Sequence, residues 1–302
     1  MENPLSSLSD HLASVVERAG QSVVAIHARP RFDSSGVHWK PGIIVTAEHT
    51  IRRDDDIRIT AANGVAHTAE LVGRDPGTDL AVLRVKDLDV PVAPRAESGA
   101  ARPGNVVLAV GRMKDSASAA FGVLSSISGP SQTWRGGRLD QVVRLDLSLH
   151  PGASGGAVVD ASGNLIGIAT SALSRVSVFA IPLSTVGRVA DKLLAHGRVP
   201  RGYLGVGLQP VSIPDHLKSK LNLSSSSGLI AISVDPEAPA GRAGMVIGDI
   251  LLELSGAPIG DSEDVQEALD SDSIGKTIKA RILRGGELTD LDVTVGERPR
   301  KA

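Results

Sequence analysis

The chain has 302 residues, enough for about two domains, and its 32 basic and 34 acidic side chains leave a net charge of -2 at pH 7. This near balance, without a long run of lysine or arginine, predicts no nucleic acid partner and no anionic membrane partner. There is no cysteine, which excludes disulfides and thiolate metal sites, and we expect neither a metal nor a cofactor.

The first twenty residues are predicted to form an amphipathic helix. Apolar side chains recur at helical spacing, at Leu5, Leu8, Leu12, Val15 and Val16. We expect Ser9 as the helix cap and Gly20 as its stop. The stretch lacks the basic start and the continuous apolar core of a secretory signal peptide, and no segment approaches the length of a membrane span. We therefore expect a soluble chain, with no signal peptide in the sequence as given. Removal of an upstream export segment is the alternative, and the sequence itself leaves the compartment open.

Residues 22–180 read as short strands separated by turns. The 33 glycines and 17 prolines, with few aromatic residues, are typical of this organisation. Ten apolar runs stand out, namely SVVAIHA, GIIVTA, DIRIT, DLAVLRV, NVVLAVG, FGVLSSI, QVVRLDL, GAVVD, LIGIAT and SVFAI. Without intervening helices, such runs predict an antiparallel barrel or sandwich, and two small barrels fit their number.

A second helix is predicted to close the first domain. The period changes in LSTVGRVADKLLAHG, where we expect Ser184 as the cap and Gly197 as the stop. The segment RVPRG then reads as a short linker. We therefore expect domains at residues 1–197 and 198–302, the second being a small α+β module.

The stretch LHPGASGGAV places Ser154 among three glycines. Glycine supplies backbone conformations that other residues reach only at a cost, and it lets a ligand approach the main chain closely. A serine on such a turn can attack a carbonyl if a base takes its proton and backbone N–H groups receive the oxyanion. The alternative is an ordinary tight turn between strands.

Two further residues complete a candidate constellation with Ser154. His49 follows the apolar run GIIVTAE, so its ring is expected at the end of a buried strand, although a surface histidine there is the commoner case. Asp79 opens the apolar run DLAVLRV, where an unpaired carboxylate is costly. Asp75, in RDPGTD, is explained by a turn in which it bonds its own backbone. A carboxylate, an imidazole and a hydroxyl together suit nucleophilic serine chemistry.

These motifs resemble those of the chymotrypsin-like serine proteases, and most closely the HtrA (Deg) family. Val45, Thr46 and His49 match its V-T-x-x-H pattern, residues 78–83 match T-D-L-A-V-L, and residues 151–157 match P-G-N-S-G-G-A except at Ala153. The resemblance covers essentially the whole chain. It implies two six-stranded antiparallel β-barrels and a catalytic triad of His49, Asp79 and Ser154.

The resemblance also implies an oxyanion hole and a substrate pocket. The backbone N–H groups of Gly152 and Ser154 form the implied oxyanion hole. Each donor in such a site stabilises the transition state by about 3 kcal/mol. Ser148 matches the base of the pocket and is uncharged, and the positions that resemble the substrate-pairing strand are Ile168, Ala169 and Thr170. We expect a shallow pocket for small or medium apolar side chains.

The second module resembles the PDZ domain of the same family. GYLGVGL alone reads as a strand interrupted by glycine. The small residues Ala240, Ala243, Gly244 and Gly248, followed by Asp249 and Ile250, strengthen the resemblance. It implies a carboxylate-binding loop at Tyr203, Leu204, Gly205 and Val206, and a peptide that pairs as an added strand. The other wall of the groove is implied to be a helix with Val265, Ala268 and Leu269. Packing in the core is the alternative role for these three side chains and is at least as common for a residue such as Leu269.

The function implied by the resemblance is an ATP-independent serine endopeptidase that cleaves unfolded or damaged proteins in protein quality control, with a PDZ domain that binds peptide C-termini. The alternative is a proteolytically latent peptide-binding or chaperone-like protein, because residues 128–140 resemble the family's regulatory loop. The family also implies a homotrimer formed through aromatic residues near the N-terminus, where this chain has only Phe32 before Trp39. It further implies a periplasmic location.

Overall fold

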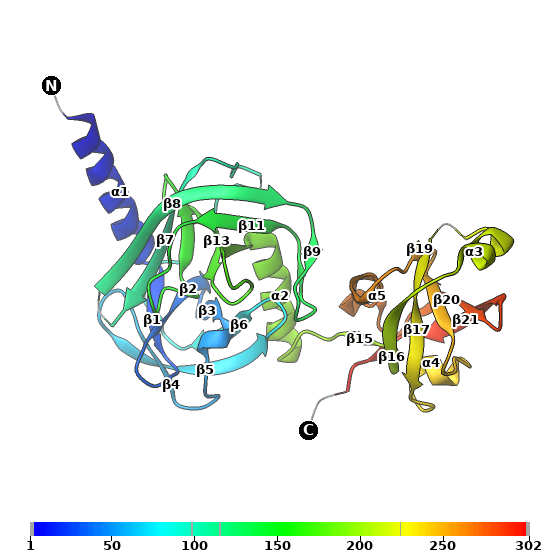
Figure 1. Ribbon diagram of the computed structural model, residues 1–302. Helices are drawn as coiled ribbons and strands as arrows, with labels where there is room; N and C mark the ends of the chain where they lie inside the picture. Colours follow the sequence, from blue (N-terminus) through cyan, green and yellow to red (C-terminus); the bar gives the residue numbers. More distant parts are fainter. Residues whose placement is uncertain (1–2, 98, 115, 224, 300–302) are drawn as a thin grey trace. The chain divides into compact units, whose positions relative to one another are not determined.

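In the computed structural model, residues 3–97, 99–114, 116–223 and 225–299 are described. The chain divides into two compact units between Val199 and Pro200. No helix within these ranges is both long enough and apolar enough to cross a membrane. Figure 1 shows the elements in chain order.

The first unit begins with a closed antiparallel barrel of six strands. The strands follow the order β1-β2-β3-β6-β5-β4. Their bounds are β1 Val23–His27, β2 Ser34–Lys40, β3 Ile43–Ala47, β4 Ile57–Thr60, β5 Ala66–Asp75 and β6 Leu80–Val85. A short 3-10 turn, η1 Glu48–Thr50, follows β3. The barrel interior is aliphatic, with Ile26, Ile44, Ile57, Ile59 and Leu83 fully buried.

A second closed barrel of six strands completes the expected pair, so the predicted fold class is confirmed. Its order is β11-β14-β13-β12-β7-β8. The bounds are β7 Val106–Met113, β8 Ser116–Ser128, β11 Val142–Asp146, β12 Ala157–Asp160, β13 Leu165–Thr170 and β14 Val178–Pro182. A small hairpin, β9 Ser131–Gln132 with β10 Arg138–Leu139, stands between β8 and β11.

Two helices pack on the barrels, and both begin earlier than expected. Helix α1 spans Pro4–Gly20 and is capped by the Asn3 side chain, which accepts a hydrogen bond from Leu5 N. Helix α2 spans Leu183–His196 and ends at Gly197, whose φ is +71°. Ser9 and Ser184 were therefore wrongly predicted as caps, because each lies inside a helix that an upstream residue starts. Gly20 and Gly197 end the helices as predicted.

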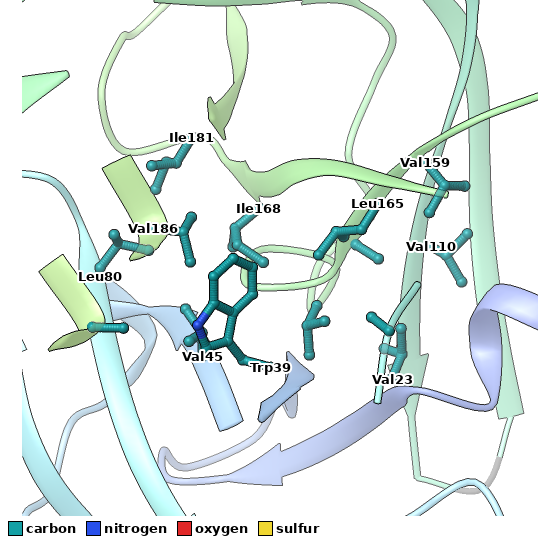
Figure 2. Packing of buried hydrophobic residues seen from close by; sticks show 14 of the residues in the cluster. Val23, Trp39, Val45, Leu80, Val110, Val159, Leu165, Ile168, Ile181 and Val186 are labelled. Carbon is teal, nitrogen blue, oxygen red and sulfur yellow. The ribbon is translucent and has the colours of Figure 1, made fainter. Parts of the chain in front are cut away.

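The largest apolar cluster joins both barrels to both helices. Trp39 lies at its centre, 2% exposed, among side chains of β3, β6, β13 and α2 (Figure 2). This shared core fixes the two barrels against each other. Loops from both barrels therefore keep a constant geometry where they meet, which is where the functional residues lie.

The second unit is a small α+β module around one sheet. The main path is β16-β17-β18-β20-β21, with β19 beside β18 and a separate pair β15-β22. The strands are β15 Gly202–Tyr203, β16 Val206–Ser212, β17 Ser227–Val234, β18 Ile250–Leu254, β19 Ala257–Pro258, β20 Thr277–Arg284, β21 Glu287–Thr294 and β22 Gly296–Glu297. The helices are α3 Asp215–Leu221, α4 Pro239–Arg242, α5 Ser262–Ala268 and the 3-10 turn η2 Ser271–Ser273.

Candidate active site

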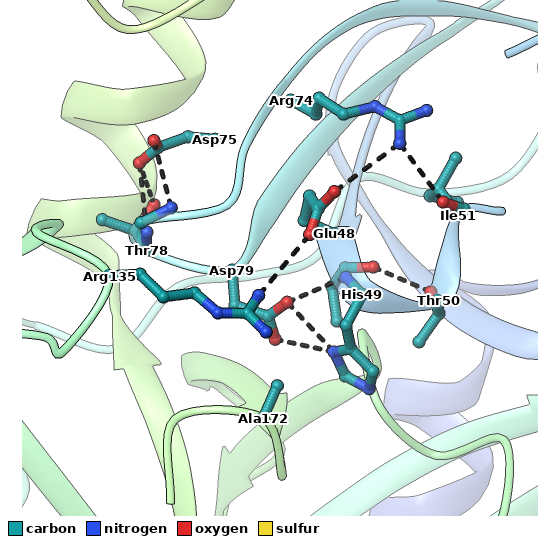
Figure 3. Close-up of polar contacts among 12 residues, drawn as sticks. Glu48, His49, Thr50, Ile51, Arg74, Asp75, Thr78, Asp79, Arg135 and Ala172 are labelled. Carbon is teal, nitrogen blue, oxygen red and sulfur yellow. Dashed lines mark hydrogen bonds and ion pairs between the residues drawn. The ribbon is translucent and has the colours of Figure 1, made fainter. Parts of the chain in front are cut away.

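Strand pairing in the first barrel brings His49 and Asp79 together. Ala47, at the end of β3, pairs with Leu80, at the start of β6. The residues just outside these ends therefore face each other. His49 Nδ1 lies 2.9 Å from Asp79 Oδ2, and His49 N donates to Asp79 Oδ1 at 2.9 Å (Figure 3). Because a carboxylate can only accept, Nδ1 carries a proton and the lone pair of a neutral ring is left on Nε2.

Asp79 is held rigidly in an unusual conformation. Its side chain is fully buried, and its φ of +58° lies in the left-handed region. Asp75 builds the preceding turn by accepting hydrogen bonds from Thr78 N and Thr78 Oγ1, at 3.1 and 2.7 Å, as expected for a turn residue. Strain of this kind persists where the surroundings determine the conformation, and it clusters at functional sites.

The second barrel supplies another partner for the same carboxylate. Thr170, the last residue of β13, is fully buried and donates its hydroxyl to Asp79 Oδ2. With the two donors from His49, the buried carboxylate accepts from a ring N–H, a backbone N–H and a hydroxyl. Buried charges are tolerated when paired and hydrogen-bonded in this way.

The hairpin between β8 and β11 contacts this side of the site. Thr133 donates its hydroxyl to the carbonyl of Gly77 at 2.7 Å, two residues before Asp79. Arg135 lies 4.0 Å from the carboxylate of Glu48, which Arg74 approaches to 3.5 Å (Figure 3). Segment 128–140, expected to resemble a regulatory loop, thus touches the neighbours of both Asp79 and His49.

Ser154 lies in the turn before β12, and its side chain shares one cleft with His49. The cleft has a volume of about 710 Å³ and is lined by both residues. Ser154 is 7% exposed. Within the described ranges its Oγ has one side-chain hydrogen bond, to Ser171 Oγ at 3.4 Å, and none joins it to His49. The hydrogen bond between a catalytic serine and its histidine is often long or poorly aligned without substrate and tightens when substrate binds.

The turn before Ser154 lies beside the cleft and has a defined backbone conformation. Ala153 N donates to His150 O at 3.0 Å, and Gly152 has a φ of +97°. Pro151 therefore occupies the second position and Gly152 the third of a type II turn, where glycine is favoured. A Cβ at Gly152 would lie 2.9 Å from the carbonyl oxygen of Asp33, so the position is also sterically restricted to glycine.

Two amides of this turn remain available. The N–H groups of Ala153, Gly155 and Gly156 donate to backbone carbonyls. Those of Gly152 and Ser154 donate to no acceptor among the described protein atoms. Both residues line the cleft. These are the two donors that the oxyanion-hole prediction requires.

The predicted substrate pocket is only partly supported. Ser148 lines the cleft, but Ile168, Ala169 and Thr170 do not. Ile168 pairs with Ala157 on one side and Ile181 on the other, so this stretch of β13 is a central strand buried in the core. The chain leaves the sheet after Thr170, and the facing wall is formed by Ser171 and residues 174–178. Thr170 instead donates a hydrogen bond to Asp79.

The second unit carries a separate groove. All four predicted loop residues, Tyr203, Leu204, Gly205 and Val206, line a cavity of about 190 Å³. Val265 and Leu269 form part of its wall, whereas Ala268 does not. Arg298, which the sequence interpretation missed, also lines the cavity. It directly follows β22, and no local pattern marks it as a groove residue.

The loop that lines this groove has its carbonyls bonded to the protein and two of its amides unpaired within the part of the chain that the structure describes. Its carbonyls at Leu204 and Gly205 accept from Ala240 N and Asp235 N, each at 2.9 Å. The N–H groups of Leu204 and Gly205 have no acceptor among the described protein atoms. Gly205 has a φ of +76°, and a Cβ there would lie 2.0 Å from Ala238 Cβ. Free amides beside an arginine suit a carboxylate.

No group of three or more histidine, aspartate or glutamate side chains is arranged to hold a metal ion in the described part of the chain. Both sites are instead built from hydroxyls, an imidazole, a carboxylate and backbone amides. Such groups suit acyl transfer and peptide binding.

Comparisons with known proteins match both units. Residues 34–168 match the trypsin-like peptidase domain, and residues 202–295 match the PDZ domain. The serine endoprotease DegS of Haemophilus influenzae is 30% identical over 268 residues, covering 86% of this chain and 75% of that protein. A Halomonas elongata protein named "Probable periplasmic serine endoprotease DegP-like" is 32% identical over 264 residues, covering 85% of this chain. The chain spans only 55% of that relative's length.

A solved structure agrees over nearly the whole chain. The structure described as "HtrA-type protease AlgW with decapeptide" has a TM-score of 0.77 and 28% sequence identity. The match covers 96% of this chain and 99% of that one.

Proposed function

The chain belongs to the HtrA (Deg) family of serine endoproteases, and we propose that it hydrolyses peptide bonds with Ser154 as nucleophile, His49 as general base and Asp79 as the group that orients His49. The observation that carries the proposal is the 2.9 Å contact between His49 Nδ1 and Asp79 Oδ2, at the edge of the cleft that also holds Ser154. We assign catalysis to residues 1–197 and peptide binding to residues 198–302.

The reaction proceeds by acyl transfer. The Ser154 oxygen forms a bond to the substrate carbonyl carbon while His49 Nε2 takes the hydroxyl proton, and Asp79 stabilises the resulting imidazolium. The carbonyl oxygen becomes an oxyanion and accepts hydrogen bonds from the amides of Gly152 and Ser154. Each of these bonds stabilises the transition state by about 3 kcal/mol. The oxyanion then re-forms the carbonyl as the C–N bond breaks, and His49 gives its proton to the leaving amine. A water molecule, deprotonated by His49, attacks the acyl-enzyme in the same way, and the bond to the Ser154 oxygen breaks as that oxygen regains a proton.

Unfolded or damaged polypeptides are the proposed substrates, and peptide C-termini the proposed ligands of the PDZ domain. An extended segment can pair with the cleft of a barrel or add a strand beside β16. The cavity of about 190 Å³ at the carboxylate-binding loop is lined by Leu204, Leu208, Val265 and Leu269, so it favours one aliphatic terminal side chain. Binding of a peptide by the related protease agrees with this assignment.

Cleavage is proposed to follow small or medium apolar residues. Ser148 contributes no charge to the cleft, and the charged residues that line it are three arginines, Arg29, Arg144 and Arg175, and one aspartate, Asp146. Because the arginines outnumber the aspartate, a basic substrate side chain would meet net positive charge in this cleft. Cleavage rates of peptides that differ only at this residue should favour alanine or valine, whereas a strong preference for arginine would contradict the assignment.

A homotrimer in the periplasm is the proposed assembly and location. Phe32 is 57% exposed and available for a contact, whereas Trp39 is buried in the core. Leu5 and Leu8 on α1 are also exposed. Light scattering should give three times the chain mass of 31.2 kDa, and a monomer at micromolar concentration would contradict the trimer.

The direct test is cleavage of an unfolded protein without ATP. Reduced and carboxymethylated lactalbumin should be fragmented by the wild type and left intact by Ser154→Ala. Equal fragmentation by both would show that Ser154 is not the nucleophile. No fragmentation by either would favour the proteolytically latent alternative, which the comparisons do not support.

A further inference from the structure

We propose that Ser35 is a positioning residue that holds the oxyanion turn in its working shape. This inference rests on the proposed function, because it concerns the amides of Gly152 and Ser154. Ser35 lies on β2 in the first barrel, while the turn belongs to the second. It therefore acts across the boundary between the two barrels.

Ser35 binds the turn at two points. Its hydroxyl donates to the carbonyl of Gly152 at 2.7 Å, and its backbone N–H donates to the carbonyl of Ser154 at 3.2 Å. Ser35 is fully buried, so water does not compete for these bonds. One residue thus holds the carbonyls of both residues whose amides are the proposed oxyanion donors.

The direction of the Ser35 hydroxyl is fixed by its other neighbour. The N–H of Arg112 donates to Ser35 Oγ at 2.9 Å and occupies one lone pair. The hydroxyl proton then has the Gly152 carbonyl as its near acceptor, since the Arg112 carbonyl lies farther away, at 3.4 Å. The Ser35 hydroxyl therefore donates its proton to the Gly152 carbonyl of the turn.

The same residue is tied to the strand that carries the general base. Thr46 donates its hydroxyl to the carbonyl of Ser35 at 2.6 Å, and Thr46 lies three residues before His49. A Cβ at Gly155 would lie 2.2 Å from that same carbonyl oxygen, which shows how closely the nucleophile turn approaches β2. Ser35 therefore links the His49 strand to the Ser154 turn.

These bonds matter because the turn has unusual backbone freedom. Gly152 and Gly155 both have positive φ, and glycine can leave such conformations at little cost. Rotation of one peptide plane would aim a carbonyl instead of an amide at the developing oxyanion. By fixing the carbonyls of Gly152 and Ser154, Ser35 restrains the adjoining planes that carry the two donors.

The chain offers a matched control in the adjacent residue. Ser34 lies on the same strand and is also fully buried, but its hydroxyl has no hydrogen-bond partner among the residues that the structure describes. Serine-to-alanine substitution at either position removes one buried hydroxyl from β2. Only the substitution at Ser35 removes a bond to the oxyanion turn.

The test compares wild type, Ser35→Ala and Ser34→Ala on a peptide substrate and on a peptide aldehyde of the same sequence. Ser154 adds to the aldehyde carbon, and the former carbonyl oxygen then occupies the oxyanion hole. We expect Ser35→Ala to lower kcat about 10- to 100-fold, with KM changed about twofold or less, and to weaken aldehyde inhibition by the same factor as kcat. Ser34→Ala should match the wild type in all three.

Equal kcat and equal aldehyde affinity in the two variants, with an active wild type, would overturn the role of Ser35 and leave the proposed function standing. A wild type that neither turns over substrate nor binds aldehyde would overturn the proposed function, and this inference with it. If Ser35→Ala does not fold, Ser35→Cys tests the same bond, because a thiol is a weaker donor. It should show a smaller parallel loss in kcat and aldehyde affinity, and no loss would contradict the role.

Discussion

Asp79→Asn isolates the orienting role proposed for this carboxylate, because the substitution changes a hydrogen-bonding pattern and almost no volume. Asp79 Oδ1 accepts the backbone N–H of His49 at 2.9 Å, and Oδ2 accepts the Thr170 hydroxyl. Both oxygens lie within 3.0 Å of His49 Nδ1. Asparagine has only one oxygen to place, so one of these positions must hold an NH₂ group.

The backbone N–H of His49 determines which of the two positions holds the NH₂ group. An NH₂ group at Oδ1 would face the N–H of His49, so the amide oxygen takes this place. The NH₂ group then faces Thr170 Oγ1, which can accept, and His49 Nδ1. The amide oxygen remains 3.0 Å from Nδ1, but the NH₂ group at the nearer position, 2.9 Å away, would point its hydrogens at an Nδ1–H. Moving the ring proton to Nε2 removes this conflict and lets Nδ1 accept from the NH₂ group, and a ring in that form cannot take the proton of Ser154. We expect kcat to fall about 10⁴-fold, equivalent to about 5 kcal/mol of activation free energy.

The assay is kcat and KM on a peptide substrate, with thermal unfolding of the same samples. Folding should change by only about 1–3 kcal/mol, because the lost bonds are a few charged hydrogen bonds. Asp160→Asn is the control, since Asp160 accepts from the N–H groups of Ser162 and Asn164 in a turn outside the cleft. If Asp79→Asn retains more than about a tenth of kcat, or if the control loses as much, the orienting role is refuted.

Two further predictions concern the PDZ domain. Arg298→Gln should weaken binding of a peptide ending in valine about three- to tenfold in fluorescence anisotropy, because a charge-assisted hydrogen bond is lost. Arg242→Gln, outside the groove, should not, and equal effects would contradict the role of Arg298. Burial alone would raise the pKa of Asp249, but hydrogen bonds from Arg284 and Val246 hold it below its ordinary 3.8. Because the folded-state pKa is lowered, this contribution to stability is present above that value and lost as the pH falls through the folded-state pKa. Protection factors of amides in β17 and β18 of the full chain, which are corrected for the pH dependence of intrinsic exchange, should therefore fall on acidification below about pH 4. The fall should be smaller in Asp249→Asn, and identical profiles would contradict the prediction.

The sequence identified the His49 and Asp79 pair because each follows or opens a strongly apolar run. Such runs become paired strands β3 and β6, and pairing sets their ends side by side. Glycine spacing likewise identified the Ser154 turn, where Gly152 and Gly155 have positive φ. Local signals suffice when the chemistry lies at the ends of regular elements.

Two barrel strands, β2 and β5, escaped the apolar-run criterion for physical reasons. Strand β2 reads SSGVHWK, and its serines are buried although polar. Ser35 is buried because it bonds a turn more than a hundred residues away, which no local pattern encodes. Strand β5 alternates irregularly in exposure and bends near Gly73, where the register shifts.

Three residues of the predicted substrate pocket lie outside the cleft lining for a related reason. Ile168, Ala169 and Thr170 were expected at the pocket, but the sheet continues through Thr170 before the chain turns into the cleft wall. The apolar pattern of the sequence does not show at which residue a strand leaves the sheet and begins to line the cleft. Arg298 was missed because only the fold returns it to a loop nearly a hundred residues earlier.

The central claim is that Ser154 is a nucleophile activated by His49. Treatment of the full chain with a fluorophosphonate, followed by peptide mass mapping, tests it most directly. The account predicts one adduct per chain, on Ser154, and none in His49→Ala under the same conditions. An adduct on another residue, or labelling of Ser154 that does not depend on His49, would contradict it.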